Sequence, residues 1–398
     1  MPDVPVMPGI LRVGFKYAKL DSLLDMDRFP NVEQVDVDDT PISSFEGLEA
    51  CPNVKRVSAR RCRPLGSLRG LQNARELEEL DVSMQDVYWG GEDRTPGRLA
   101  SLRGLENCTS LVKLDATGNA IASTAGLGNC AALDDLVLWR NQVERVEGLE
   151  GCSRLRKIKL AENPLASLDG IEAVAGSLVV LDVSKTRVSS LEPLRAFSTL
   201  ARLEASNTPV NDLEPLRGCE GLEKLIINDT PVERFDALRG LPRLRTIEAG
   251  GTGVTSLDWL PAHGFLDNAV VGGPNLQVVA VPPHVRSAIM FGVSSSPVSS
   301  FSIEAPLDVQ TLVLESTTPI TSFHFPPHVL PPGAYLHLTY EQSRMSSEEL
   351  LAYMRWLLPN VPAGSATWKE LCQVTGAARI DCEDPVFREW EREWRSSC

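Results

Sequence analysis

The chain has 398 residues, 43% of them hydrophobic and 23% charged, which is the composition of a folded protein and excludes wholesale disorder. The formal net charge of −14 argues against direct binding to nucleic acid or to an anionic membrane, because both require clustered positive charge. The sequence has no run of 18 apolar residues that would predict a transmembrane helix, and it lacks the basic start and apolar stretch of a secretory signal. We therefore expect a cytoplasmic protein without a membrane partner.

From residue 10 onward the chain repeats one short motif. The clearest copies have a period of 22 residues, once 23, and begin at Leu111, Leu133, Leu155, Leu178, Leu200, Leu222 and Leu244. With the first residue of a copy as offset 0, apolar residues recur at offsets 0, 3, 5 and 10, and again in a Gly-Leu or Pro-Leu pair at offsets 15 and 16. The frame extends back to Ile10 and, more loosely, forward to about Gly333, which predicts about fifteen coils.

Each copy has room for one short strand at offsets 2 to 6, a turn and a short return segment. One copy cannot bury its leucines alone, but stacked copies bury them in a continuous ladder. The pattern therefore predicts an α/β fold in which residues 1–340 form a solenoid. We expect a curved parallel β-sheet on its concave side and short turns or 3-10 segments on its convex side.

The consensus LxxLxLxxN/TxV, followed by GLxxC, resembles the leucine-rich repeat family. It is most similar to the 22-residue subclass found in a regulatory subunit of type-1 protein phosphatase and in bacterial internalins. The resemblance covers more than four-fifths of the chain and implies a leucine-rich repeat solenoid. Because architecture rather than activity defines this family, the function has to be argued from particular residues.

Two columns of the repeat are expected to be structural. Offset 8 carries Asn or Thr, and a buried Asn there can bond backbone groups of its own and the next coil, whereas Thr makes fewer bonds; these residues are Thr40, Asn119, Asn141, Asn163, Thr186, Thr208, Thr230 and Thr252. Three residues before the next coil comes an apolar slot that five of the nine cysteines fill: Cys51, Cys108, Cys130, Cys152 and Cys219. The odd total and the absence of a Cys-x-x-Cys pair favour reduced thiols over disulfides or a zinc site.

Side chains at offsets 2, 4 and 6 should point onto the concave face, because side chains alternate along a strand. Offset 2 is mainly basic and offset 4 mainly acidic, so neighbouring rows can pair with each other as an ordinary solvated surface. A recognition surface for a protein partner is the second interpretation.

One cluster on this face departs from the charged pattern. Trp139 lies at offset 6, and Trp and Arg are the residues most enriched in binding hot spots. The cluster, which we predict to bind a partner, comprises Trp139, Arg140, Lys157, Lys159, Asp115 and Asp135. The alternative is that Trp139 lies flat under Arg140 as a cation–π pair.

An insertion lengthens the coil that begins at Leu77, because the next copy of the motif begins only at Leu111. The excess is predicted as an exposed loop at 85–98, rich in Gly, Pro and charge. Tyr88 and Trp89 in this loop either contact a partner or tuck back onto the convex side.

Beyond residue 267 the composition changes. Residues 268–340 form degenerate coils with only four charged side chains, and the predicted concave residues Val270, Ile289 and Val313 are apolar. Such a sheet needs a partner or an internal cover. Residues 341–398 break the repeat, hold four of the seven tryptophans and show helical spacing, so we expect a helical C-terminal cap over the open end of the solenoid.

No catalytic signature appears in the sequence: it has no Gly-rich phosphate loop, no HExxH and no GxSxG. We therefore expect neither an enzyme nor a cofactor or metal. The hypothesis is a scaffold that binds a protein partner of unknown identity on its concave face. The alternatives are a regulatory subunit of a protein phosphatase, which the resemblance permits, and a structural subunit of a large cytoskeletal or ribonucleoprotein assembly.

Overall fold

The computed structural model of the chain describes residues 5–84, 95–303, 305–317, 322–324 and 335–340. They fall into two units: an N-terminal unit of Met1–Val210 and Gly218–Leu222, and a C-terminal unit of Asn211–Arg217 and Glu223–Cys398. Tyr88, Trp89 and the expected cap at 341–398 lie outside the described residues.

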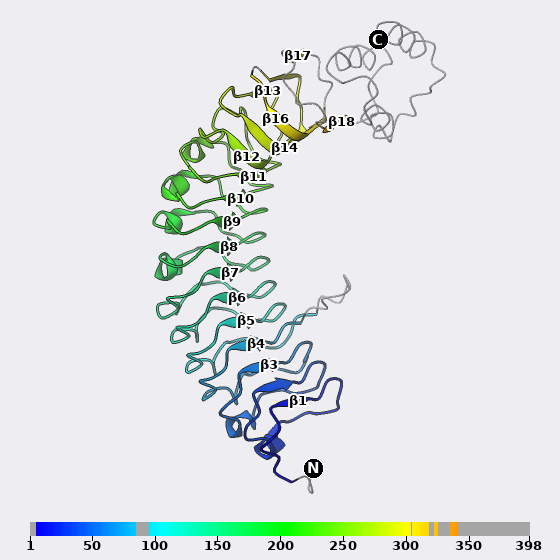
Figure 1. Cartoon of the computed structure of the whole chain (residues 1–398), viewed down its shortest axis with the longest axis vertical. Coiled ribbons are helices and arrows are strands. Elements are labelled where there is room, and N and C mark those ends of the chain that lie inside the picture. Colours follow the sequence, from blue (N-terminus) through cyan, green and yellow to red (C-terminus); the bar gives the residue numbers. More distant parts are fainter. Residues whose placement is uncertain (1–4, 85–94, 304, 318–321, 325–334, 341–398) are drawn as a thin grey trace, which may run out of the picture. The chain divides into compact units, whose positions relative to one another are not determined.

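In its described part, the N-terminal unit is a stack of short parallel strands, one from each coil (Figure 1). The strands pair in chain order and are β1 (Arg12–Gly14), β2 (Gln34–Asp36), β3 (Arg56–Ser58), β4 (Glu79–Asp81), β5 (Lys113–Asp115), β6 (Asp135–Val137), β7 (Lys157–Lys159), β8 (Val180–Asp182) and β9 (Arg202–Glu204). Short 3-10 helices occur in the return segments: η1 (Leu24–Arg28), η2 (Leu48–Ala50), η3 (Ile171–Val174) and η4 (Glu192–Leu194). The predicted solenoid of short parallel strands is confirmed.

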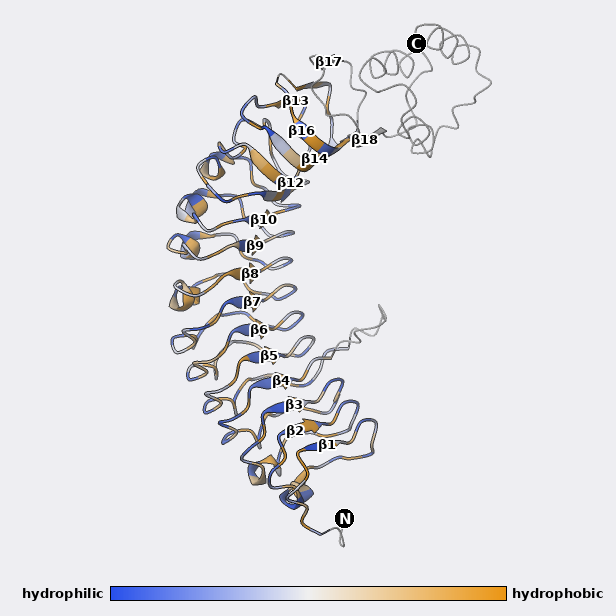
Figure 2. Ribbon diagram, in the orientation of Figure 1, coloured by the Kyte–Doolittle hydropathy of each residue, from blue (hydrophilic) through white to orange (hydrophobic). Residues whose placement is uncertain are grey.

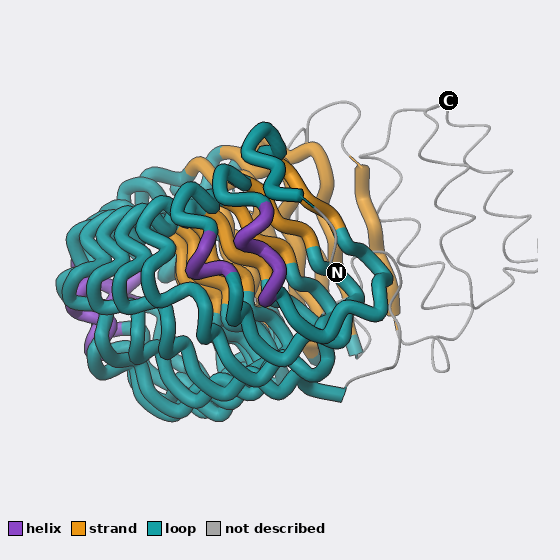
Figure 3. The backbone as a smooth tube through the Cα atoms, turned by 90° about the horizontal axis from the view of Figure 1, so that it is seen from below, coloured by secondary structure: helices purple, strands orange, loops and turns teal. Residues whose placement is uncertain are grey.

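The register follows the repeat, because every strand pairs equal offsets of successive coils, as in Asp135 with Lys157 and Leu136 with Ile158. The middle residue of strands β2 to β9 is buried, and the residues on either side are half-buried or exposed. Each buried Leu, Ile or Val contributes roughly 1.5–3 kcal/mol, so this ladder is the core of the unit. In Figure 3 the strands form one layer, and the loops complete each coil.

In the N-terminal unit the turn after every strand except β4 has a left-handed backbone at offset 7, a regularity that the sequence reading missed. Non-glycine residues occupy it with φ between 55° and 60° at Tyr17, Asp39, Arg61, Arg140, Glu162, Lys185 and Asn207, and Gly118 occupies it with φ 77°. Glycine and asparagine adopt this conformation most readily, so their occurrence in the column was the signal available in the sequence.

The Asn column at offset 8 closes the coils, as predicted. The buried Asn141 side chain donates to the carbonyl of Leu138 in its own coil (3.1 Å) and to that of Ala116 in the preceding coil (2.9 Å). Its Oδ1 accepts from the Ile121 N–H at 3.0 Å. Thr186, by contrast, donates to the carbonyl of Val183 in its own coil at 2.6 Å.

All six described cysteines are buried and free. Cys130 and Cys152 direct their Sγ atoms to the carbonyls of Leu105 (3.5 Å) and Leu127 (3.2 Å) one coil back. Burial raises the pKa of the Cys130 thiol to about 12 and that of the Cys152 thiol to about 11. Cys62 stands at offset 8 in place of Asn or Thr, and its Sγ lies 3.1 Å from the Val37 carbonyl.

The C-terminal unit begins with the same short coils and then widens. Its main parallel sheet contains β10 (Lys224–Ile226), β11 (Thr246–Ala249), β12 (Phe265–Val271), β14 (Ser287–Ser296), β16 (Asp308–Ser316) and β18 (Tyr335–Tyr340), in that order. A second, three-stranded sheet contains β13 (Val278–Val281), β15 (Ser300–Ile303) and β17 (Ser322–His324). The 3-10 helices η5 (Glu214–Gly218) and η6 (Asp236–Leu238) precede these wider coils.

The register of the wider coils corrects one detail of the sequence frame. Val270 pairs with Gly292 and Gly292 with Val313, so Gly292 occupies the place expected for Ile289. The repeat frame had slipped by three residues because the prolines and small residues of this region obscure its apolar pattern. Ile289 is nevertheless exposed. Figure 2 shows hydrophobic colours on β12 and β16, in contrast to the hydrophilic colours of β4 and β7.

Replacement of Asn141 tests the closure of the coils. Asn141→Ala leaves the Ile121 N–H without its side-chain acceptor, whereas the carbonyls of Ala116 and Leu138 each keep a second donor, from Asn119 and Asn163. We expect it to lower the free energy of unfolding by about 2 kcal/mol. Asn141→Thr should lose less, because Thr retains the bond within its own coil. Urea unfolding at pH 7 measures both, with the exposed Asn129→Ala as the control; equal losses in all three variants would contradict the assignment.

The buried thiols predict a fall in stability at alkaline pH. The pKa of these thiols is raised in the folded chain, so between about pH 9 and pH 11 they ionise in the unfolded chain but not in the folded chain. Over this range each thiol lowers the free energy of unfolding by about 1.4 kcal/mol per pH unit. The advantage of the natural chain over Cys130→Ala/Cys152→Ala should therefore shrink by about 2–3 kcal/mol from pH 7 to pH 10. Urea unfolding at the two pH values measures this, and an unchanged difference would show that these thiols ionise equally in both states.

Candidate partner-binding site

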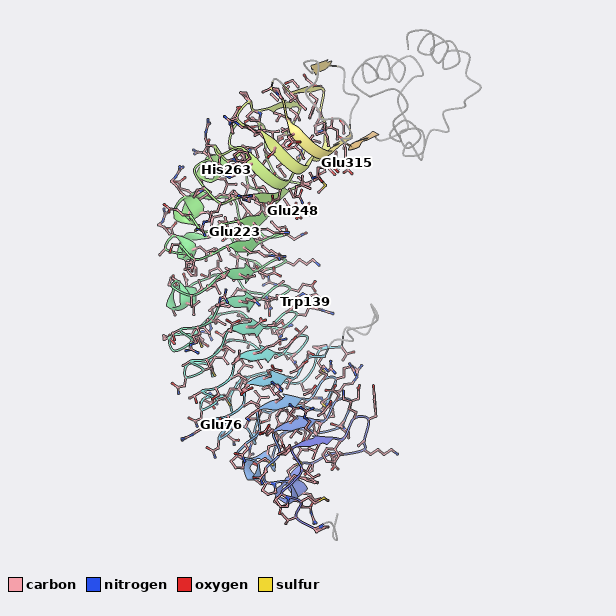
Figure 4. All side chains as sticks on the ribbon, in the orientation of Figure 1. Glu76, Trp139, Glu223, Glu248, His263 and Glu315 are labelled. Carbon is pink, nitrogen blue, oxygen red and sulfur yellow. The ribbon has the colours of Figure 1, made fainter. Side chains whose placement is uncertain are left out.

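We define the sheet face as the outward side chains at offsets 2, 4 and 6 of the N-terminal unit. The burial pattern of its strands agrees with the predicted alternation, since Lys113 and Asp115 are accessible on either side of buried Leu114. In Figure 4 the labelled Trp139 projects on the strand side of its coil, and Glu76 lies on the opposite side.

The acidic row at offset 4 has a structural role that the sequence reading missed. Asp115 accepts a hydrogen bond from the Thr117 N–H at 3.0 Å, and Asp182 accepts one from the Ser184 N–H at 3.0 Å. The same bond forms at the turns after β2 and β4, from Asp38 to Asp36 (3.2 Å) and from Ser83 to Asp81 (3.0 Å). These carboxylates stabilise the turns after β2, β4, β5 and β8, so they do not by themselves indicate a binding site.

Around Asp38 the charges of the sheet face satisfy one another. Asp38 is 1% exposed and accepts from Arg60 Nη2 (2.7 Å) and Nε (2.9 Å) and from the Ser58 hydroxyl (2.6 Å), and the Lys16 ammonium lies 3.5 Å away. Burial alone would raise the pKa of Asp38, but the hydrogen bonds from Arg60 and Ser58 outweigh it and hold the pKa below its usual value. This part of the face is a closed network.

Trp139 lies in a different environment. It is half-buried, and its neighbours at offset 6 are the smaller side chains of Thr117 and Ala161. The Arg140 guanidinium carbon is 5.9 Å from the centre of the indole ring, near the outer limit of a cation–π contact. Arg140 Nε also lies 3.6 Å from Glu162, so the guanidinium is shared between the ring and an ion pair.

The lysines beside Trp139 are exposed and weakly paired. Lys157 Nζ is 3.9 Å from Asp135 Oδ2, and the enclosed Asp135 Oδ1 has no hydrogen-bond partner in the described residues. Lys159 pairs in register with Val137 and Asp182, but no described carboxylate lies within ion-pair distance of its ammonium.

The structure thus brings six of the eight predicted site residues together on β5, β6, β7 and the turn after β6: Asp115, Asp135, Trp139, Arg140, Lys157 and Lys159. Tyr88 and Trp89 lie outside the described residues. We name the six the Trp139 cluster. It combines an indole with exposed ammonium groups, which suits contact with a surface that offers apolar and acidic groups.

In the described parts of the chain no group of three or more His, Cys, Asp or Glu side chains is arranged to hold a metal ion. None of the helices described there is both long and apolar enough to cross a membrane.

No known protein-family pattern matches the chain, and no curated protein matches its sequence. Solved structures do resemble it. A leucine-rich repeat protein of Leptospira interrogans has a TM-score of 0.60 at 12% identity, over 89% of this chain and 95% of that one. Toll in the Toll–Spatzle complex of Drosophila has a TM-score of 0.58 at 14% identity, over 77% of this chain and 44% of that one.

A third similar structure is the functional domain of InlJ from Listeria monocytogenes, which is described as including a cysteine ladder. Its TM-score is 0.50 at 14% identity, over 76% of this chain and 69% of that one. At these identities the likeness shows the fold alone, and that fold is the leucine-rich repeat. The resemblance to a phosphatase regulatory subunit stays a prediction.

Asp38→Asn tests whether the network over β1 to β3 is structural. Because the folded pKa of Asp38 is lowered, its stabilisation is present at neutral pH and is lost as the pH falls through the folded pKa. We expect the substitution to destabilise the chain by about 3 kcal/mol at pH 7 and by clearly less at pH 3. Unfolding curves at both pH values measure this, with the exposed Glu76→Gln as control, and a loss independent of pH would contradict it.

Proposed function

We propose that this protein is a non-enzymatic interaction scaffold whose N-terminal unit binds a protein partner through the sheet face, on the concave side of the coils. The observation that carries the proposal is the Trp139 cluster. There an accessible tryptophan lies beside lysines that lack close ion-pair partners, on a face where the other charges largely satisfy one another.

The energetic argument rests on what a partner would gain at each group. Lys157 and Lys159 do not need to break a strong internal ion pair in order to bind a carboxylate. Trp139 offers a large apolar area, and a well-packed Trp at the centre of an interface commonly contributes about 2 kcal/mol or more. By comparison, Asp38 and Arg60 would have to give up a buried bidentate pair, so β1 to β3 is the poorer binding surface.

The Trp139–Arg140 contact leaves part of the indole ring accessible to a partner. The guanidinium lies over one side of the indole at 5.9 Å and also contacts Glu162. A partner can therefore stack on the accessible part of the ring while Arg140 keeps its place in the turn. Under this proposal the partner presents an apolar side chain flanked by Asp or Glu.

The fold supports a binding role without identifying the partner. The similar Toll structure is described as that of a Toll–Spatzle complex, which supports a role in protein binding for this chain. The two alternatives, a phosphatase regulator and a subunit of a large assembly, stay predictions from the sequence.

The double variant Trp139→Ala/Lys159→Glu tests the proposal directly. Loss of the anchor and reversal of a rim charge should reduce partner capture from a cell extract at least tenfold, because together they remove about 1.4 kcal/mol or more of binding free energy. Quantitative mass spectrometry of the captured proteins measures this, and thermal unfolding should show little change because both side chains are on the surface.

The matched control is Arg187→Glu, which makes the same kind of charge reversal at an exposed residue of the turn region. It should capture the same partner as the natural chain. If the double variant retains the partner, or the control loses it equally, the Trp139 cluster is not the contact surface.

A further inference from the structure

A cavity of about 510 Å³ opens on the strand side of the C-terminal unit, where β11 gives way to the wider coils. We propose that it is a binding site for a cationic side chain, arginine or lysine, presented by an extended peptide segment. The proposal concerns the C-terminal unit alone and does not rest on the function proposed for the Trp139 cluster.

The hollow lies beside Gly250 and Gly251, which hold offsets 6 and 7 of their coil and both line it. The preceding coil has Asn228 and Asp229 at these offsets, and they line the cavity as well. Gly251 has φ 68°, and a Cβ on it would lie 2.3 Å from Asp229 Oδ1. The Asp229 carboxylate therefore sits against a bare backbone, at a place where only glycine leaves room for it.

The walls of the cavity carry negative charge. Asp229 and Glu248 both line it, and no lysine or arginine does. Glu248 is partly neutralised by Lys224 at 3.4 Å. The exposed Glu315 stands at offset 6 of a neighbouring coil, and Figure 4 shows Glu248 and Glu315 both projecting on the strand side. Glu315 does not line the cavity, but the two carboxylates that do line it, against the one ammonium of Lys224, favour a cationic ligand over an anionic one.

The remaining lining suits the stem and the donors of such a side chain. Val270 and Met290 supply an apolar wall, and arginine and lysine both bury methylene stems along apolar surface. Asn268 also lines the cavity, and its enclosed Oδ1 accepts no hydrogen bond from the described residues. An arriving N–H donor would satisfy it, with a small rotation of the amide.

A multivalent metal ion is a poorer occupant. No cluster of three metal-ligating side chains exists among the described residues, and the two carboxylates that line the cavity belong to different coils. A guanidinium, by contrast, offers five donors in a planar fork and can reach several acceptors at once.

The test uses the full-length chain and two probes, N-acetyl-arginine methylamide and its uncharged counterpart N-acetyl-citrulline methylamide, with the lysine compound as a third arm. Saturation-transfer NMR titrations measure the affinities. The arginine or lysine compound should bind with a Kd about tenfold lower than that of citrulline, as the loss of one charge-assisted hydrogen bond predicts.

Two variants locate the binding. Asp229→Asn/Glu248→Gln removes the charge and should weaken the cationic probe about tenfold. Gly250→Leu fills the hollow without a change of charge and should also weaken binding of the cationic probe. The fold should tolerate this side chain, because a Cβ at Gly250 meets only Ser294 Oγ (3.2 Å) and Asn228 Oδ1 (3.4 Å). Glu223→Gln/Glu233→Gln makes the matched charge change at exposed acids outside the cavity and should leave binding intact. Equal affinity for arginine and citrulline, or undiminished binding to both cavity variants, overturns the assignment.

Discussion

The stacked coil can exist only because the backbone polar groups at its turn find partners after they leave water. Each turn buries carbonyl groups of two adjacent coils, and an unpaired buried carbonyl costs about 1–3 kcal/mol. The Asn141 amide satisfies two of them and the Ile121 N–H as well, so each such residue joins its own coil to the preceding one. Cys62 makes one such contact, from its thiol to the Val37 carbonyl of the preceding coil. The leucine ladder supplies most of the stabilisation, and the Asn residues of this column add side-chain bonds from one coil to the next.

Much of the fold could be predicted from the sequence because one offset carries one physical role in every coil. Leu114, Leu136 and Ile158 are buried wherever the frame places them, and the register follows from the period alone. The frame failed at Ile289, where the apolar period weakens and pairing with β12 decides the register instead. The second sheet of the C-terminal unit was likewise not predicted, since its strands fall in return segments that elsewhere form 3-10 turns.

The candidate site was only partly predictable, for a related reason. The sequence places Trp139 and Lys159 on one face, but it does not tell which charges are already paired. Asp115 reads as a surface acid, yet it is committed to the Thr117 N–H, whereas Lys159 stays available. The cavity beside Glu248 was missed because absent side chains create it. The Gly-Gly pair at 250–251 is visible in the sequence, but only the three-dimensional arrangement of the neighbouring coils shows that it lines a cavity.

The left-handed positions at offset 7 carry charged surface side chains on which the fold does not depend. Arg140, Glu162 and Lys185 adopt a backbone conformation that costs a non-glycine residue roughly 1–2 kcal/mol, and glycine, which stands there at Gly118, would avoid that strain. Their substitution by glycine would relieve the strain at the expense of a more flexible unfolded chain, so the stack would keep about the same stability. The chain therefore holds a run of charges that its architecture does not require. Such positions are where natural variation can exchange one recognition chemistry for another without endangering the solenoid.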